Sequence, residues 1–308
     1  MNALIPHAVA AAALLAAAFP APALAQAPRR APSTDNTVQV ARGTQLFVNN
    51  FAGEVVVHAW DRDQVRVLAH HNSRVRVNLR EGQNSLRISS SSSSGTTSVD
   101  YDIAVPAWMP VRVSGTFNYV EVNGVEADIA AETVRGDVRV KGGSGVVTLK
   151  SIEGEVYAED TKGRLTVSSV NEGVTLLRPS GEVSAETING EILITDAKAT
   201  SVEATTVNGD VRYTGTIAEN GLYRLTTHQG DILVGVPDNV DATVSVRTYQ
   251  GEFRSSFGFN AADSETRRGR RQTFTVGRGT AQIELESFGG EIRLRKLSEV
   301  PPPRQRKH

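Results

Sequence analysis

Apolar residues recur along most of the chain as pairs separated by one residue, and the pairs return at a fixed step. From Val111 to Ile194, ten consecutive pairs follow one another every nine residues without a slip. Beyond Ile194 the step lengthens to between nine and twelve residues, and the pattern continues to Leu294. Alternation over about five residues, followed by a turn with glycine, indicates a β-strand, whereas a helix has a 3.6-residue period. The pattern therefore predicts short strands and almost no helix.

Every second unit carries a richer motif, in which Ser or Thr stands three positions before a Gly that is followed by an acid, as in Thr187 to Glu191. The repeat is therefore 18–21 residues long and contains two unlike strands. Two such strands can bury their apolar faces only against neighbouring repeats. We predict an all-β fold, a single-stranded parallel β-solenoid (β-helix) with two main sheets, in which equivalent residues form columns about 4.8 Å apart. An antiparallel sandwich or barrel is the alternative, but it does not explain why alternate units match each other best.

Glycine in the richer motif is predicted to mark the corners of the coil. A tight turn needs a residue that tolerates positive φ, which glycine does without steric cost. The predicted corner residues are Gly136, Gly154, Gly190, Gly209, Gly230, Gly251 and Gly290.

The regular repeats occupy residues 109–297, and the rest of the chain departs from them in composition or period. Residues 36–108 follow the pattern more loosely, which predicts an N-terminal β region that is continuous with the solenoid or caps it. The Ser-rich stretch 89–98 is predicted to be a flexible loop. Residues 257–278 interrupt the period and are predicted to form an inserted loop, and residues 298–308 are predicted to be a disordered basic tail.

An apolar stretch near the N-terminus is followed by the small-residue triplet Ala23-Leu24-Ala25. This arrangement predicts a signal peptide over residues 1–25 that is cleaved after Ala25, with residues 26–35 as a linker. The protein is then exported, to the periplasm or to the extracellular side of the cell surface. A membrane anchor is the competing interpretation, but the apolar run is shorter than the roughly 20 residues of a membrane span.

The composition and the motifs of the chain limit the kinds of chemistry that it could perform. The 308 residues carry a formal net charge of −1, so no general field attracts nucleic acid. There is no cysteine, which excludes disulfides, thiolate metal sites and a cysteine nucleophile. Zinc-protease, serine-hydrolase, phosphate-loop and dinucleotide motifs are all missing from the sequence. We therefore expect no enzyme activity, no cofactor and no metal, and no membrane span after signal cleavage.

Stacking the repeats would turn the acid of the motif into a charged ladder. Like charges 4.8 Å apart repel by about 0.9 kcal/mol in water, so the acids must be hydrated or paired. Arginine recurs two positions after the acid, on the same strand face, and we expect it to neutralise the ladder. Divalent cation binding and a catalytic carboxylate pair are the less favoured alternatives. The acids proposed as a candidate binding surface are Asp137, Glu155, Glu191, Asp210, Asp231 and Glu252, and Glu291 continues their series.

Three further features bear on binding. Arg267, Arg268, Arg270 and Arg271 form a basic run in the predicted loop, which could grip phosphate, a sulfated glycan or lipid headgroups, although a solvated loop is the plainer interpretation. A second ladder, made of threonines, is predicted to form hydrogen bonds along the stack or at the corner. An ice-binding face is the less favoured interpretation of these threonines. His228, which replaces an aliphatic residue of other repeats, is predicted to be a structural corner residue. The second ladder consists of Thr133, Thr187, Thr206, Thr227 and Thr248.

Several segments resemble one bacterial family. They are GEVVVHAWDRDQVRV at 53–67, VPAWMPVRVSGTFNYVEVNGVEADI at 105–129 and the repeats TVRGDVRV, TINGEILI and TTVNGDVRY. These segments are similar to the putative-adhesin β-strand-repeat proteins, a secreted domain of unknown function, over roughly residues 36–296. The resemblance implies an exported, non-enzymatic β-solenoid and carries over no binding residues.

Two classes of function follow from these observations. The favoured one is an adhesin or envelope interaction protein that binds a glycan or a protein through its outer faces. The alternative is a carbohydrate-active β-helix enzyme similar to a polysaccharide lyase. A carboxylate cluster with a nearby Lys or Arg beneath residues 257–278 would favour the enzyme, and a featureless groove there would favour the scaffold.

Overall fold

Strands account for nearly all regular structure in the computed structural model, which describes residues 34–93, 95–258 and 271–301. These residues belong to one compact unit, Pro32–His308. The predicted signal peptide, Arg267, Arg268 and Arg270 lie outside the described residues, as do most of the predicted linker and of the C-terminal tail. The one helical element among the described residues is the short 3₁₀ helix η2 (Leu297–Glu299).

The strands fall into an N-terminal group and the solenoid repeats. The first group is β1 (Thr34–Gln39), β2 (Gln45–Trp60), β3 (Gln64–His70), β4 (Val75–Gly82), β5 (Ser85–Ser92) and β6 (Asp100–Pro106). The repeats up to β15 are β7 (Val111–Asn123), β8 (Ile129–Glu132), β9 (Val138–Lys141), β10 (Ser144–Lys150), β11 (Val156–Glu159), β12 (Lys162–Ser168), β13 (Val174–Leu177), β14 (Ser180–Glu186) and β15 (Ile192–Asn208). The last strands are β16 (Val211–Gly215), β17 (Leu222–Gln229), β18 (Ile232–Val236), β19 (Ala242–Thr248), β20 (Phe253–Ser255), β21 (Gln272–Val276), β22 (Ala281–Ser287) and β23 (Ile292–Lys296).

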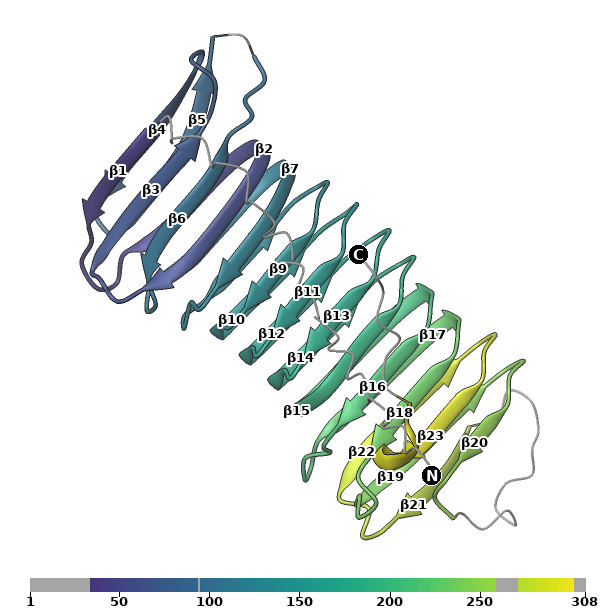
Figure 1. Ribbon diagram of the computed structural model, residues 1–308. Coiled ribbons are helices and arrows are strands. Elements are labelled where there is room, and N and C mark those ends of the chain that lie inside the picture. The colour runs from purple at the N-terminus through teal and green to yellow at the C-terminus, as the bar shows by residue number, and fades with distance from the viewer. Residues whose placement is uncertain (1–33, 94, 259–270, 302–308) are drawn as a thin grey trace, which may run out of the picture. The chain divides into compact units, whose positions relative to one another are not determined.

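Equivalent strands of successive coils pair in parallel and form two ladders (Figure 1). The ladder named sheet 1 runs through β7, β8, β10, β12, β14, the second half of β15 and β17. The ladder named sheet 2 runs through the second half of β7, then β9, β11, β13, the first half of β15, β16 and β18. Val147 pairs with Ile129 and with Leu165, each 18 residues away. The predicted parallel solenoid with two sheets and a two-strand repeat is confirmed.

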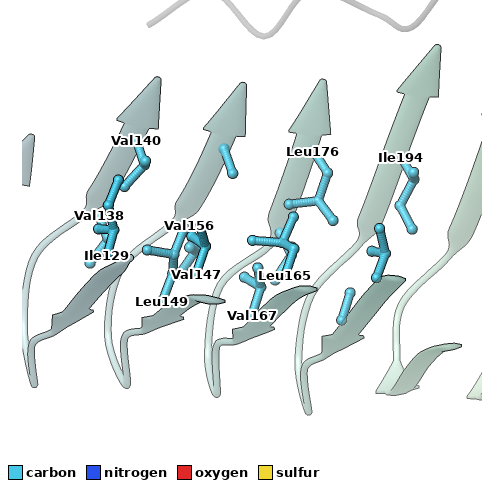
Figure 2. Packing of buried hydrophobic residues seen from close by; sticks show 14 of the residues in the cluster. Ile129, Val138, Val140, Val147, Leu149, Val156, Leu165, Val167, Leu176 and Ile194 are labelled. Atoms are coloured by element: carbon cyan, nitrogen blue, oxygen red, sulfur yellow. The ribbon is translucent and has the colours of Figure 1, made fainter. Parts of the chain in front are cut away.

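The apolar pairs of the repeat form the core between the two sheets. In β10, Val147 and Leu149 are fully buried while Thr148 between them faces outward. Figure 2 shows such pairs from successive coils, with Val138 and Val140 among them, directed into the space between facing strands. Val and Ile suit these positions because their branched side chains pack well on a pleated surface. The interior is therefore filled by the side chains of the repeat itself.

The C-terminal coils are not stacked in the order of the sequence. β22 pairs in parallel with β17 on one side and with β19 on the other. Likewise β23 lies between β18 and β20 (Figure 1). The last coil of the chain is therefore inserted beside the coil of β17 and β18, and the coil of β19 and β20 is displaced outward. The nine-residue pattern does not determine the order of the coils, because the apolar face of one coil fits that of any neighbouring coil.

Antiparallel pairs occur at the two ends of the stack in the described residues. β3 pairs with β1 and β6, β4 forms a hairpin with β5, and β21 pairs with β19. These strands cover sheet edges that would otherwise be open. β21 lies within residues 257–278, and β5 extends to Ser92 in the Ser-rich stretch. The predictions of loops are wrong at these two places, because β21 pairs with β19 and the Ser-rich part of β5 pairs with β4.

Candidate interaction surface

The Ser and Thr of the richer motif lie inside the corner that joins a sheet 1 strand to the following sheet 2 strand, here called the hydroxyl corner. Most of these side chains are at least 95% buried. Thr206 donates from Oγ1 to the carbonyl of Gly190 in the preceding coil at 3.0 Å, and Thr227 donates to Gly209 at 2.8 Å. Ser151, Ser169, Thr187 and Ser287 make the same contact with the preceding coil. The predicted hydrogen-bonding ladder is confirmed.

The corner glycines are required by close packing between coils. A Cβ added to Gly209 would lie 2.0 Å from the carbonyl oxygen of Gly190, and one added to Gly154 would lie 2.1 Å from that of Gly136. Most of the seven corner glycines do not have a φ in the left-handed region, and Gly136 at +120° is the clear exception. These glycines lie between a sheet 1 strand and the following sheet 2 strand, but the predicted reason for glycine there, positive φ, is wrong for most of them. Each glycine lets two corner backbones touch.

The acids after the corner glycines form a ladder on the outer face of sheet 2, as predicted. Some of their carboxylates also accept hydrogen bonds from the backbone of the neighbouring coil. Asp137 accepts a hydrogen bond from the backbone N–H of Glu155 at 3.0 Å, and Asp210 accepts one from Asp231 at 2.8 Å. Asp231 in turn accepts one from Glu291 at 2.9 Å, because β23 is the neighbour of β18. An aspartate here links successive coils in addition to carrying charge.

The arginines two positions after the acids pair with this ladder. Arg293 lies 2.8 Å from Asp231, and Arg254 lies 3.0 Å from both Glu252 and Glu291. The hydrogen bond to Glu252 raises the pKa of Arg254. Charge pairing of the ladder, which the sequence predicted, is therefore present at these coils.

One arginine of the predicted column, Arg212, has a partner outside the acid ladder. The guanidinium of Arg212 donates to the backbone carbonyl of Pro301, where the chain after η2 crosses the outer face of sheet 2. Arg271 lies exposed immediately before β21. Of the four arginines of the basic run, Arg271 is the one that lies within the described residues.

The described histidines have structural neighbours. His228 is exposed at the hydroxyl corner, where its ring stacks on Phe288 with 4.8 Å between centroids. This agrees with the predicted corner position. His58 lies 3.1 Å from Asp102. Within the described residues, no three His, Asp or Glu side chains are grouped so that they could hold a metal ion.

An exposed apolar column, which sequence reasoning missed, runs along the hydroxyl corner. Each member directly follows the Ser or Thr of the motif, which is buried except for the half-buried Thr248, so it points outward where the chain bends from one sheet to the other. Five members are between 37% and 45% exposed: Val134, Ile152, Ile188, Val207 and Phe288. With Val170, His228 and Tyr249 they form what we call the corner stripe. The repeated order of hydroxyl residue, apolar residue, any residue and glycine is the signal that could have revealed it.

The neighbours of the corner stripe change along the stack. Beside Val134 and Ile152, Arg135 and Glu153 form an ion pair. From Val170 onward the adjacent position holds amides, except for Gly289 beside Phe288, and Asn208 donates to Asn189 at 2.9 Å. At the far end Phe288 packs against His228 and against Tyr249, whose ring centroid is 5.2 Å away. The stripe thus borders mainly amides over its second half and ends in three rings in contact, with the guanidinium of Arg247 4.8 Å from the ring centroid of Tyr249.

Parallel two-strand coils around a filled core, with the charged ladder turned outward, define the protein as a β-solenoid. The chain belongs to the Toastrack DUF4097 family, whose model matches residues 44–295. The resemblance to repeat proteins of unknown function is thereby confirmed. No helix in the described part of the chain has the length and apolar character needed to cross a membrane.

Comparison with solved structures finds similarity to proteins from three bacteria. A putative adhesin from Bacteroides fragilis NCTC 9343 is 13% identical, with a TM-score of 0.40, over 84% of this chain and 95% of that one. A putative cell adhesion protein from Clostridium sporogenes ATCC 15579 is 11% identical, with a TM-score of 0.21, over 85% and 99%. A putative lipid binding protein from Parabacteroides distasonis ATCC 8503 is 11% identical, with a TM-score of 0.41, over 86% and 98%. Comparison with curated proteins gives no match.

Proposed function

We propose that this protein is an exported, non-enzymatic scaffold of the bacterial envelope that binds a protein partner along the corner stripe. The observation that carries the proposal is the repeated exposure of aliphatic and aromatic side chains at one corner of successive coils. Scattered exposed apolar residues are normal on a protein surface, but a contiguous set of them marks an interaction site.

The composition of the corner stripe fits a protein interface. Aromatic residues are enriched in the cores of interfaces and charged residues are depleted there. The second half of the stripe combines Phe288, Tyr249 and His228 with neighbouring amides that can both donate and accept hydrogen bonds. The outer charges of sheet 2 are largely occupied by ion pairs, so the stripe offers the larger gain from burial.

We favour this scaffold over the polysaccharide-lyase alternative. In the described part of the predicted loop, Arg278 lies 2.9 Å from Asp241, and Asp241 also accepts a hydrogen bond from the backbone N–H of Arg278 at 2.8 Å. These contacts lower the pKa of Asp241. Because the carboxylate of Asp241 is bonded to Arg278, it stabilises the turn before β22. We therefore assign it a structural role and not a catalytic one.

Site-specific photo-crosslinking tests the proposed surface. A photoreactive amino acid replaces Ile188 in the stripe or, as a matched control, Thr166 on the outer face of sheet 1. We expect the probe at 188 to give discrete adducts in a bacterial envelope fraction, and we expect Ile152→Glu to suppress them. Adducts that are equal for both probes, or that are unaffected by the Glu substitution, would contradict the proposal.

Export is tested separately by N-terminal sequencing of the protein recovered from the periplasm and the culture medium. We expect the mature protein to begin at Gln26. An intact N-terminus in the recovered protein would rule out the proposed cleavage without affecting the stripe.

A further inference from the structure

The outer face of sheet 2 contains a depression of about 430 Å³ that crosses three neighbouring strands, β7, β9 and β11. The acid ladder contributes to its wall, but its characteristic residues lie elsewhere on these strands. They are Tyr119 and Glu121 on β7, Arg139 and Lys141 on β9, and Tyr157 and Glu159 on β11. Pockets of 300–1,000 Å³ are the usual size for small-molecule ligands.

The two flanking strands present the same local arrangement, a Tyr-x-Glu sequence. In each strand the side chains at i and i+2 share the outer face, so the phenol reaches the carboxylate. Tyr119 donates to Glu121 at 2.9 Å, and Tyr157 donates to Glu159 at 3.2 Å. Burial, followed by the hydrogen bond to Glu121, raises the pKa of Tyr119 to about 12. The tyrosines are therefore neutral, held in place and half-buried on both sides of the depression.

The central strand supplies the basic groups. Arg139 lies 3.6 Å from Asp137, and Lys141 lies 3.6 Å from Glu159. Both distances are longer than a hydrogen bond, so the polar hydrogens of these cations can turn toward a ligand. The guanidinium of Arg139 also lies 5.8 Å from the ring centroid of Tyr119, so it borders the face of that ring. Glu121, in contrast, already accepts hydrogen bonds from Tyr119 and from Asn123, the latter at 2.6 Å.

We propose that this depression is a binding site for an uncharged oligosaccharide. Its lining combines three carboxylates and two cations, so an anionic ligand and a cationic ligand would each meet like charge. Sugar hydroxyls both donate and accept, which matches a wall of alternating acids, bases and an amide. The tyrosine rings supply apolar contact for the C–H face of a sugar ring, and their hydroxyls supply a polar edge.

A second depression provides a matched control. It lies on the outer face of sheet 1, has a volume of about 260 Å³ and contains Arg164, Glu182, Leu222 and Arg224. Ion pairs are present there too, with Arg164 2.8 Å from Glu182. No aromatic residue lines it. The two sites therefore differ in the feature that the proposal requires for a sugar ring.

Isothermal titration calorimetry tests the site with hexasaccharides of glucose and mannose as neutral probes, and with oligogalacturonate and spermine as charged ones. We expect at least one neutral probe to bind and the two charged probes to bind more weakly. The double variant Tyr119→Ala/Tyr157→Ala is expected to lose about tenfold or more in affinity. The control pair Arg164→Ala/Leu222→Ala is expected to stay within about twofold of the unmodified protein.

The conservative pair Tyr119→Phe/Tyr157→Phe covers the case in which the alanine variant does not fold, since it keeps both rings. We expect it to bind more weakly than the unmodified protein, because each Glu loses its phenol partner and the wall loses the two hydroxyl oxygens that form its polar edge. Any of three results would overturn the proposal. They are absence of binding by every neutral probe, tighter binding of a charged probe, and unchanged affinity in both tyrosine variants. Ile188→Glu in the corner stripe should leave sugar binding unchanged, so failure of the proposed protein interface is measured independently.

Discussion

The two corners of each coil reverse the chain by different physical means. At the hydroxyl corner, a buried Ser or Thr bonds to the preceding coil and a glycine lets two backbones touch. At the opposite corner, where sheet 2 leads into the next sheet 1 strand, the turn begins with a residue at positive φ. Asp160, Arg178 and Asp196 stand there at φ of 55°, 51° and 53°, with side chains in contact with solvent.

The difference shows which positions depend on neighbouring coils. A left-handed residue is a local backbone requirement that Asp tolerates better than most residues and Gly tolerates best. Close contact between two coils is a tertiary requirement that any side chain beyond hydrogen would violate. A glycine in contact with a neighbouring coil should therefore be more sensitive to substitution than a left-handed residue. The opposite corner also contains such glycines, since a Cβ on Gly163 would lie 2.4 Å from the carbonyl oxygen of Gly145 and one on Gly181 would lie 2.2 Å from that of Gly163.

The largest effect is expected for Gly209→Ala at the hydroxyl corner. The new Cβ would lie 2.0 Å from the carbonyl oxygen of Gly190, and backbone atoms can move apart only by separating two coils. We expect a loss of about 3 kcal/mol in the free energy of unfolding. Urea denaturation measures it, with the exposed neighbour Asn208→Ala as control. Equal midpoints for the two variants would remove the distinction between the corners.

A smaller loss is expected for Thr206→Val, which keeps the shape of a buried side chain but removes its donor. Thr206 is 2% exposed, and its hydroxyl bonds to Gly190 at 3.0 Å. We expect destabilisation of about 1–2 kcal/mol in urea denaturation, because the Gly190 carbonyl loses that partner. Thr205→Val, one residue away and only half-buried, should change stability by less than about 0.5 kcal/mol. The reverse ranking would contradict a structural role for the hydroxyl ladder.

Substitution of Asp196 at the opposite corner should be nearly neutral when the new residue is glycine. Release of the left-handed strain is offset by the greater chain entropy of glycine, so we expect a change within about 0.5 kcal/mol. Asp196→Val should cost about 1–2 kcal/mol, since a β-branched residue is poorly accommodated at a φ of 53°. Thermal denaturation of both variants decides whether this corner is governed by local conformation.

The smallest effect concerns the ion pair between Arg178 and Asp160, two left-handed residues of adjacent coils. Arg178 lies 2.7 Å from Asp160 and holds the pKa of that carboxyl below its ordinary value of 3.8, chiefly by a hydrogen bond. A lowered pKa means that the contribution to stability is complete above the unfolded value and is lost as the pH falls through the folded one. Arg178→Gln should raise the pKa of Asp160 toward 3.8 in a carboxyl-detected NMR titration. An unchanged titration would show that the pair is not formed in solution.

Much of the fold could be predicted because the repeat encodes its own burial. The apolar pairs of the template, such as Val147 and Leu149, lie in the core as expected. The contact of Arg254 with Glu252 follows from i and i+2 spacing, whereas the contact of Arg293 with Asp231 connects two coils. The candidate surfaces could be predicted only in part. The depression depends on Tyr119 and Tyr157 meeting across β9, although they stand 38 residues apart in the sequence.

By itself, the sequence determined the strand period, the two-strand repeat, the inward and outward faces and the corner positions. These are local properties, because alternation and turn residues act within a few bonds of one another. The tertiary structure alone decided that β22 and β23 enter between earlier coils, that the corner glycines serve backbone contact, and that Ile188 and its equivalents face outward. Each of these depends on which coil lies next to which, and identical apolar faces cannot specify that choice.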